Sequence, residues 1–203
     1  MAVRLKTKWH RSKRSDRNRK GAAQAKTLVD LSSVIGINIW KLAKEAFTHM
    51  EKEGYRFKED QQTMDVVFEF MVYQLQIVDR LLYGKVSEEE RSAFINALAQ
   101  DLLKTIDINQ IELFGPGDYI APYIERMNER LSNYSDCEFN DKQPSYHFTR
   151  YLAQCIAEHM KISDDKWVVE QVIDIEAPVI IEKIVRVTED VLGLRNKKPA
   201  TPD

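Results

Sequence analysis

Residues 62–83 read QTMDVVFEFMVYQLQIVDRLLY and decide the fold of this chain. At about 100° per residue, as in an α-helix, the apolar side chains of this stretch spread over most of the helix circumference. A helix of that kind is mostly buried, so other helices must pack around it. The remaining arc carries residues that recur every three or four positions and form one polar and aromatic stripe: Asp65, Glu69, Tyr73, Gln76, Arg80 and Tyr83.

This stripe has two interpretations, and the sequence leaves both open. Charged, amide and phenol groups on an otherwise apolar helix are suited to line a pocket or to contact a protein partner, and Tyr73 and Tyr83 are of the type enriched at interfaces. Every helix at the surface of a soluble bundle also needs a face in water, and the same residues would supply it. We therefore treat the stripe as a candidate ligand or partner site.

The rest of the chain is also predicted to be helical. Apolar residues recur at helical spacing over residues 22–53, 91–106, 119–134, 145–162, 166–176 and 179–194. The spacing predicts an all-α fold, an irregular bundle of six or seven helices with mostly antiparallel neighbours. Ser87 and Glu90 form a capping-box pattern before the third helix, and Pro178 suits the first turn of the last helix.

One helix boundary and one solvent-exposed face are predicted from the same patterns. Residues 106–122 interrupt the apolar periodicity, so the third helix is expected to end near Ile106. On the fourth helix, the apolar residues lie on one side and the charged residues on the other. That second side is expected to face solvent, and it consists of Glu125, Arg126, Glu129 and Arg130.

The charge is unevenly distributed along the chain. Residues 1–20 hold nine basic residues and one acidic residue, a net charge of +8, which leaves 21 basic and 31 acidic residues, a net charge of −10, in the rest. We predict a basic mobile arm over residues 1–21, one helical domain over 22–194 and a disordered tail over 195–203. The arm residues that would contact an anionic partner are Arg4, Lys6, Lys8, Trp9, Arg11, Lys13, Arg14, Arg17, Arg19 and Lys20.

Cysteine content and hydropathy indicate a cytoplasmic protein. The chain has only Cys137 and Cys155, its first residues lack the pattern of a secretion signal, and no stretch of about 18 residues is free of charges and apolar throughout.

Recognisable catalytic motifs are absent from the sequence. It contains no Gly-x-Ser-x-Gly elbow, no His-Glu-x-x-His pair and no glycine-rich phosphate-binding loop. Cys155 and His159 are four residues apart on the fifth helix and are weak candidates for metal ligands, with Glu158 and the distant His49 as conceivable additions. A buried free cysteine behaves more often as a small apolar residue, so no metal or other cofactor is expected.

The sequence thus favours a non-enzymatic cytoplasmic binding or adaptor protein. Its acidic helical body would contact a protein partner, and its basic arm would contact nucleic acid or an anionic membrane surface. The same arm is also consistent with a solubilising tail or with a segment that folds back onto the acidic body. Two alternatives stay open. One is a helical bundle that binds a metal, haem or small ligand and has a catalytic role, and the other is an oligomerisation module.

Overall fold

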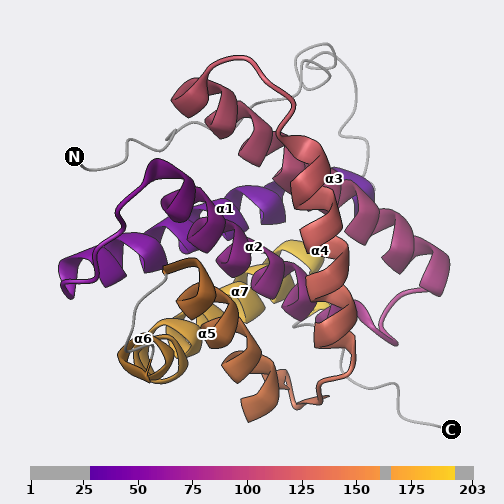
Figure 1. The fold of residues 1–203 in the computed structure, drawn as a ribbon. Coiled ribbons are helices and arrows are strands. Elements are labelled where there is room, and N and C mark those ends of the chain that lie inside the picture. Colours follow the sequence, from indigo (N-terminus) through magenta and orange to yellow (C-terminus); the bar gives the residue numbers. More distant parts are fainter. Residues whose placement is uncertain (1–27, 161–165, 195–203) are drawn as a thin grey trace, which may run out of the picture.

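Helix α2, Asp60–Leu82, runs through the middle of the fold, as Figure 1 shows. It contacts α1 (Leu28–Lys52), α3 (Glu88–Phe114), α4 (Ile120–Ser135), α5 (Tyr146–Met160) and α7 (Ala177–Leu192). The computed structural model describes residues 28–160 and 166–194. The all-α bundle predicted from the sequence is confirmed, with the stretch of residues 62–83 at its centre.

The core is built around α2 because this helix has buried side chains on nearly all sides. Phe68, Phe70, Met71 and Leu75 are fully buried and belong to one apolar core with residues of the surrounding helices. Burial of each such side chain stabilises the fold by about 1.5–3 kcal/mol before the loss of conformational entropy is considered. The surrounding helices can therefore bury narrower apolar faces and keep their outer faces in water.

Helix α3 starts where the sequence predicts but continues further. The Ser87 hydroxyl accepts a hydrogen bond from the Glu90 amide and the Glu90 carboxylate accepts one from the Ser87 amide, so the capping box is formed. The predicted end near Ile106 is wrong, because the helix continues to Phe114. Its last turns bury Gln110, whose Nε2 donates to the Tyr123 hydroxyl at 2.6 Å. A polar residue that faces α4 does not show up in an apolar pattern.

The last part of the chain is one helical segment with a wide turn inside it. Helix α6 (Lys166–Gln171) leads directly into the π-helical turn η2 (Val172–Glu176) and then into α7. The Ala177 amide donates to the Val172 carbonyl, five residues earlier, and the next residue is Pro178. Proline has no N–H and its ring clashes with the carbonyl four residues before it in a regular α-helix. The wide turn accommodates Pro178 without ending the helix.

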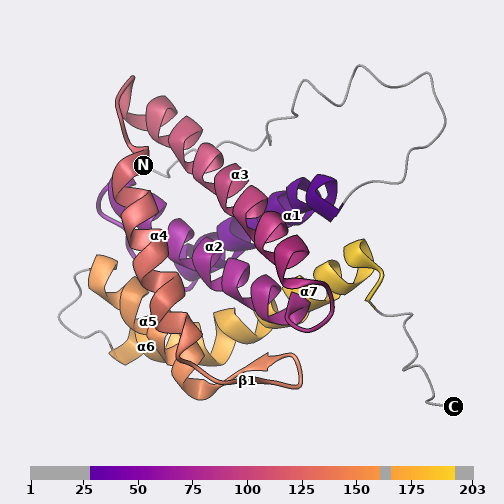
Figure 2. The same cartoon turned by 90° about the vertical axis from the view of Figure 1, so that its right-hand side faces the viewer.

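Two smaller features complete the described chain. Strands β1 (Phe139–Asn140) and β2 (Gln143–Pro144) form a short antiparallel hairpin within the predicted loop after α4, visible in Figure 2. The corner between α3 and α4 projects from the other helices in both views (Figures 1 and 2). None of the helices in the described ranges has the length and apolar character needed to cross a membrane.

Candidate functional site

The predicted stripe on α2 is covered by α4 and α5. Glu69 and Tyr73 are fully buried, Gln76 is nearly so, and only Tyr83, just after the helix, is largely exposed at 69%. The stripe is therefore neither a face in water nor an open pocket over most of its length. It forms an internal interface that holds α4 and α5 against α2.

Two arginine–carboxylate pairs join α2 to α4. Arg126 Nη1 lies 2.7 Å from Asp65 Oδ1, and Arg130 Nε lies 3.1 Å from Glu69 Oε2. His159 on α5 contacts the same buried carboxylate, with its Nε2 2.9 Å from Glu69 Oε1. A buried carboxylate needs such partners, because an unpaired charge away from water is strongly unfavourable.

The expectation that Arg126 and Arg130 face solvent is wrong. Tyr123, Met127, Arg130 and Tyr134 form the buried face of α4, whereas Ile124, predicted to be apolar core, is 42% exposed. The reason is the acidic character of the facing stripe on α2. Its carboxylates are better matched by guanidinium groups than by an apolar face.

Two later residues of the stripe, Tyr73 and Arg80, also form hydrogen bonds to α5 and to the end of α4. The Tyr73 hydroxyl lies 3.2 Å from Thr149 Oγ1 on α5, and burial raises the pKa of Tyr73 well above its ordinary range. Arg80 donates to the carbonyl oxygens of Tyr134 and Ser135 at the end of α4. Carbonyls at a helix C-terminus lack partners inside the helix, so Arg80 satisfies them. The role of the stripe as a ligand or partner site remains a prediction.

The predicted metal candidates lie next to this interface. Cys155 is buried, and burial raises the pKa of its thiol to about 12, so it is a protonated and unreactive group at neutral pH. The Nε2 atom of His159 faces Glu69, as described above. Among the described residues, no three His, Cys, Asp or Glu side chains are grouped so that they could hold a metal ion. The predicted arm, residues 1–21, lies outside the described part of the chain.

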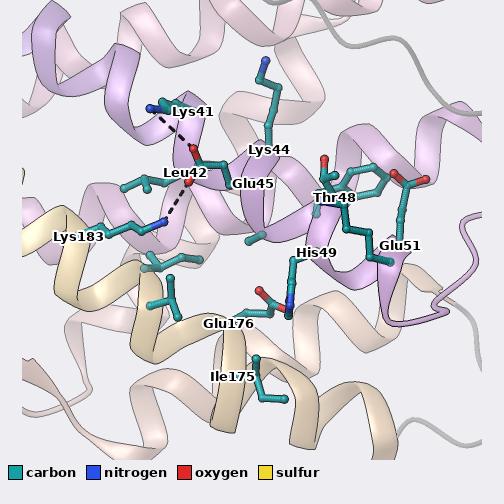
Figure 3. Close-up of a pocket in the computed structure, with 15 residues that line it drawn as sticks. Lys41, Leu42, Lys44, Glu45, Thr48, His49, Glu51, Ile175, Glu176 and Lys183 are labelled. Atoms are coloured by element: carbon teal, nitrogen blue, oxygen red, sulfur yellow. Dashed lines mark hydrogen bonds and ion pairs between the residues drawn. The ribbon is translucent and has the colours of Figure 1, made fainter.

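A pocket of about 800 Å³ lies elsewhere, between α1 and the η2–α7 segment. Figure 3 shows its side chains, which come from three turns of α1 on one side and from η2 and α7 on the other. Most of its wall surface is apolar, although nine of the fifteen lining residues are polar or charged; the apolar side chains belong to Leu42, Ala46, Phe47, Ile175, Val179 and Ile180. Val179 is 47% exposed although it is apolar, because it stands at this opening.

A histidine–glutamate pair lies at one end of the pocket. His49 Nδ1 is 2.7 Å from Glu176 Oε1, and Gln171 Nε2 donates to the same oxygen at 2.9 Å. Glu176 is nearly fully buried, whereas the His49 side chain is 44% exposed. An ionised carboxylate only accepts hydrogen bonds, so it fixes the hydrogen on Nδ1 and leaves Nε2 directed elsewhere. The Glu53 carboxylate is 3.7 Å from Nε2.

A lysine–glutamate cluster lies one turn earlier on α1. Lys183 Nζ from α7 is 3.1 Å from Glu45 Oε2, and Lys41 Nζ is 3.8 Å from Glu45 Oε1 (Figure 3). All three side chains are substantially exposed, so these ion pairs contribute little to stability. The ammonium groups of Lys41 and Lys183 remain accessible at the rim of the pocket.

The sequence did not predict this pocket. In the sequence, His49 is only a distant candidate for a metal ligand, and Glu176 belongs to a predicted helix without an expected role. The two residues are 127 positions apart, so no local spacing relates them. The one available signal is Pro178 directly after a run of helical spacing, since wide turns of this kind occur frequently at functional sites.

Comparison with protein-family models, with curated proteins and with solved structures finds no match to this chain. The geometry of the pocket is therefore the basis for the proposed function.

Proposed function

We propose that this chain is a non-enzymatic binding protein and that the pocket between α1 and η2–α7 takes a small ligand with a largely apolar body. The observation that carries the proposal is the pocket of about 800 Å³ with mainly apolar walls. Pockets for small ligands commonly have volumes of about 300–1,000 Å³, apolar walls and a few well-placed polar groups. The two polar clusters at Glu45 and at His49 provide such groups.

The walls of the pocket are suited to a ligand because the opening keeps apolar surface in contact with water. Ile175 and Val179 lie one helical turn apart and are both more than 40% exposed. A ligand that covers these side chains removes apolar surface from water, which is favourable by about 25 cal/mol per Å². The side chains of Leu42 and Phe47, which also line the pocket, are buried and packed in the core.

The histidine–glutamate pair supports binding better than catalysis. A buried carboxylate on Nδ1 of a histidine is one half of a base that activates a nucleophile. The other half requires a hydroxyl, thiol or water at Nε2, and the group beside Nε2 of His49 is the carboxylate of Glu53. The pair is suited to hydrogen bond a polar group of the ligand and to hold α1 against η2.

The proposal is tested with the uncharged fluorophore Nile red, whose emission increases in apolar surroundings. The test variant is Val179→Asp, which places a charge at the opening of the pocket. The matched control is Ile124→Asp, because Ile124 on α4 is exposed to a similar extent and does not line the pocket. We expect saturable binding to the unchanged protein and to Ile124→Asp, and affinity at least about tenfold weaker for Val179→Asp.

Circular dichroism and urea unfolding of both variants show whether each one is folded under the conditions of the titration. Equal binding by the two folded variants, or no saturable binding to the unchanged protein, contradicts the proposal.

A further inference from the structure

The two polar ends of the pocket differ in the sign of their charge. At one end, Lys41 and Lys183 share the single carboxylate of Glu45, and Lys44 beside Glu45 also lines the pocket, so that end has positive charge in excess. At the other end, His49 lies between the carboxylates of Glu176 and Glu53. Glu51 and Lys52 on the wall beside it cancel each other in formal charge. With Glu53, which lies beside the pocket and not in its wall, this second end is negative whether His49 is neutral or protonated.

The two ends are about one helical turn apart. Glu45 and His49 are separated by four residues on α1, which is about 6 Å along the helix axis. The surface between them is apolar and is formed by Ala46 from α1 and by Val179 and Ile180 from α7. A ligand that fills the pocket thus meets lysine ammonium groups at one end, apolar side chains in the middle and carboxylates at the other end.

Within residues 28–160 and 166–194, the lysine end has hydrogen-bond donors without a short contact to an acceptor. Each ammonium group has several N–H donors in rotatable positions. Glu45 is 3.1 Å from Lys183 Nζ but 3.8 Å from Lys41 Nζ, so the second contact is too long for a strong hydrogen bond. An anionic group of a ligand can accept from both lysines without displacing a short contact of Lys41.

From this charge distribution we infer that the ligand is a monoanionic amphipath, of the alkyl or aryl carboxylate class, with its carboxylate between Lys41 and Lys183. This inference depends on the proposed function, because it assigns a chemical class to the ligand of the same pocket. Its apolar body extends over Ala46, Val179 and Ile180 toward His49. The opposite orientation would place the ligand carboxylate next to Glu176 and Glu53, where like charges repel it.

The test compares three ligands that share a ten-carbon chain and differ in their head group: decanoate, decanol and decyltrimethylammonium. Calorimetric titration below the concentration at which they form micelles measures the affinity of each ligand directly. We expect decanoate to bind about tenfold more tightly than decanol, and decyltrimethylammonium to bind most weakly, because decanoate alone pairs a negative charge with the lysine ammonium groups.

Variants then locate the head group. Lys41→Gln/Lys183→Gln should remove the preference for decanoate over decanol, and Lys41→Glu/Lys183→Glu should reverse it in favour of decyltrimethylammonium. The matched control is Lys104→Gln/Lys166→Gln, which changes the net charge by the same amount at two exposed lysines outside the pocket. This control should keep the preference for decanoate.

The outcomes separate the inference from the proposed function. If the three ligands bind with similar affinity, or if both lysine double variants keep the preference for decanoate, the inference is overturned and a pocket for apolar ligands still stands. If none of the three ligands binds and Nile red does not bind either, both the inference and the proposed function are overturned. All of these lysine side chains are at the surface, so the variants are expected to fold.

Discussion

The Nδ1 atom of His49 lies 2.7 Å from the Oε1 atom of Glu176 and thereby joins the last turn of α1 to the wide turn that precedes α7. Glu176 is nearly fully buried and has a second donor in Gln171. Because a buried carboxylate that loses its donors is strongly disfavoured, this contact fixes the position of α1 relative to η2. It also shapes one end of the pocket.

Replacement of Glu176 by alanine should lower the free energy of unfolding by about 1–3 kcal/mol, since His49 and Gln171 both lose a hydrogen-bond partner. Urea unfolding measures this change. A double-mutant cycle with His49→Ala separates the contact itself from the loss of packing. The control is Glu53→Ala, which removes an exposed carboxylate near the same imidazole and should change the stability by less than about 0.5 kcal/mol. Similar losses of stability in Glu176→Ala and Glu53→Ala would show that the Glu176 contact stabilises the fold no more than an exposed carboxylate does.

Replacement of Arg130 by methionine should destabilise the fold by about 3 kcal/mol or more, because it leaves the carboxylate of Glu69 buried with only the His159 imidazole beside it among the partners described above. The double variant Glu69→Leu/Arg130→Met should be less destabilised than Arg130→Met alone, since it removes both charges. Chemical denaturation of the two variants and of Glu129→Gln, a change at an exposed neighbour, gives the comparison. A double variant that is less stable than Arg130→Met would disprove this account of the interface.

The two cysteines should differ in reactivity. In native protein at about pH 8, Cys155 should not react with a thiol reagent such as DTNB, because it is buried and its pKa is raised to about 12. Unfolded protein should show two reactive thiols. Cys137→Ser should therefore abolish the reaction of the native protein, and Cys155→Ser should leave it unchanged. Rapid native reaction in Cys137→Ser would indicate that α5 opens locally.

Burial of Cys155 also predicts a dependence of stability on alkaline pH. The thiol has an ordinary pKa of 9.0 when it is exposed, and the pKa is raised to about 12 in the folded protein. The unfolded chain thus releases this proton first, and the contribution of Cys155 to stability is lost as the pH rises from about 9 to about 12. Unfolding of Cys155→Ala should show a weaker dependence on pH over this range than unfolding of the unchanged protein.

The basic arm predicted over residues 1–21 can be tested by removing it. A chain that begins at Gly21 should bind anionic vesicles and duplex DNA more weakly than the full chain at low ionic strength. The difference should disappear as salt is added, because release of counterions drives such binding. Binding is measured by cosedimentation with vesicles and by fluorescence anisotropy with labelled DNA. Equal, weak binding by both chains at low salt would mean that the arm has no such role.

The stripe on α2 could be predicted from the sequence, whereas the pocket could not. The stripe on residues 62–83 is recognisable because α2 is apolar elsewhere, and the periodicity identifies it as one continuous row. Which groups cover this row could not be predicted. Arg126 and Arg130 lie on the side of α4 that an apolar pattern assigns to solvent, and they face α2 because Asp65 and Glu69 are there. Pairing of charges across two helices overrode hydrophobic spacing.

The sequence by itself determined the helical elements and the central place of residues 62–83. Apolar periodicity, the capping box at Ser87 and the stop at Gly193 act over a few residues, so they can be recognised without knowledge of the fold. Only the tertiary structure decided that Pro178 is accommodated by a wide turn and that Glu176 meets His49 beside an apolar pocket. Such a site depends on the packing of α1 against α7, and side chains more than a hundred residues apart share no local pattern from which their contact could be inferred.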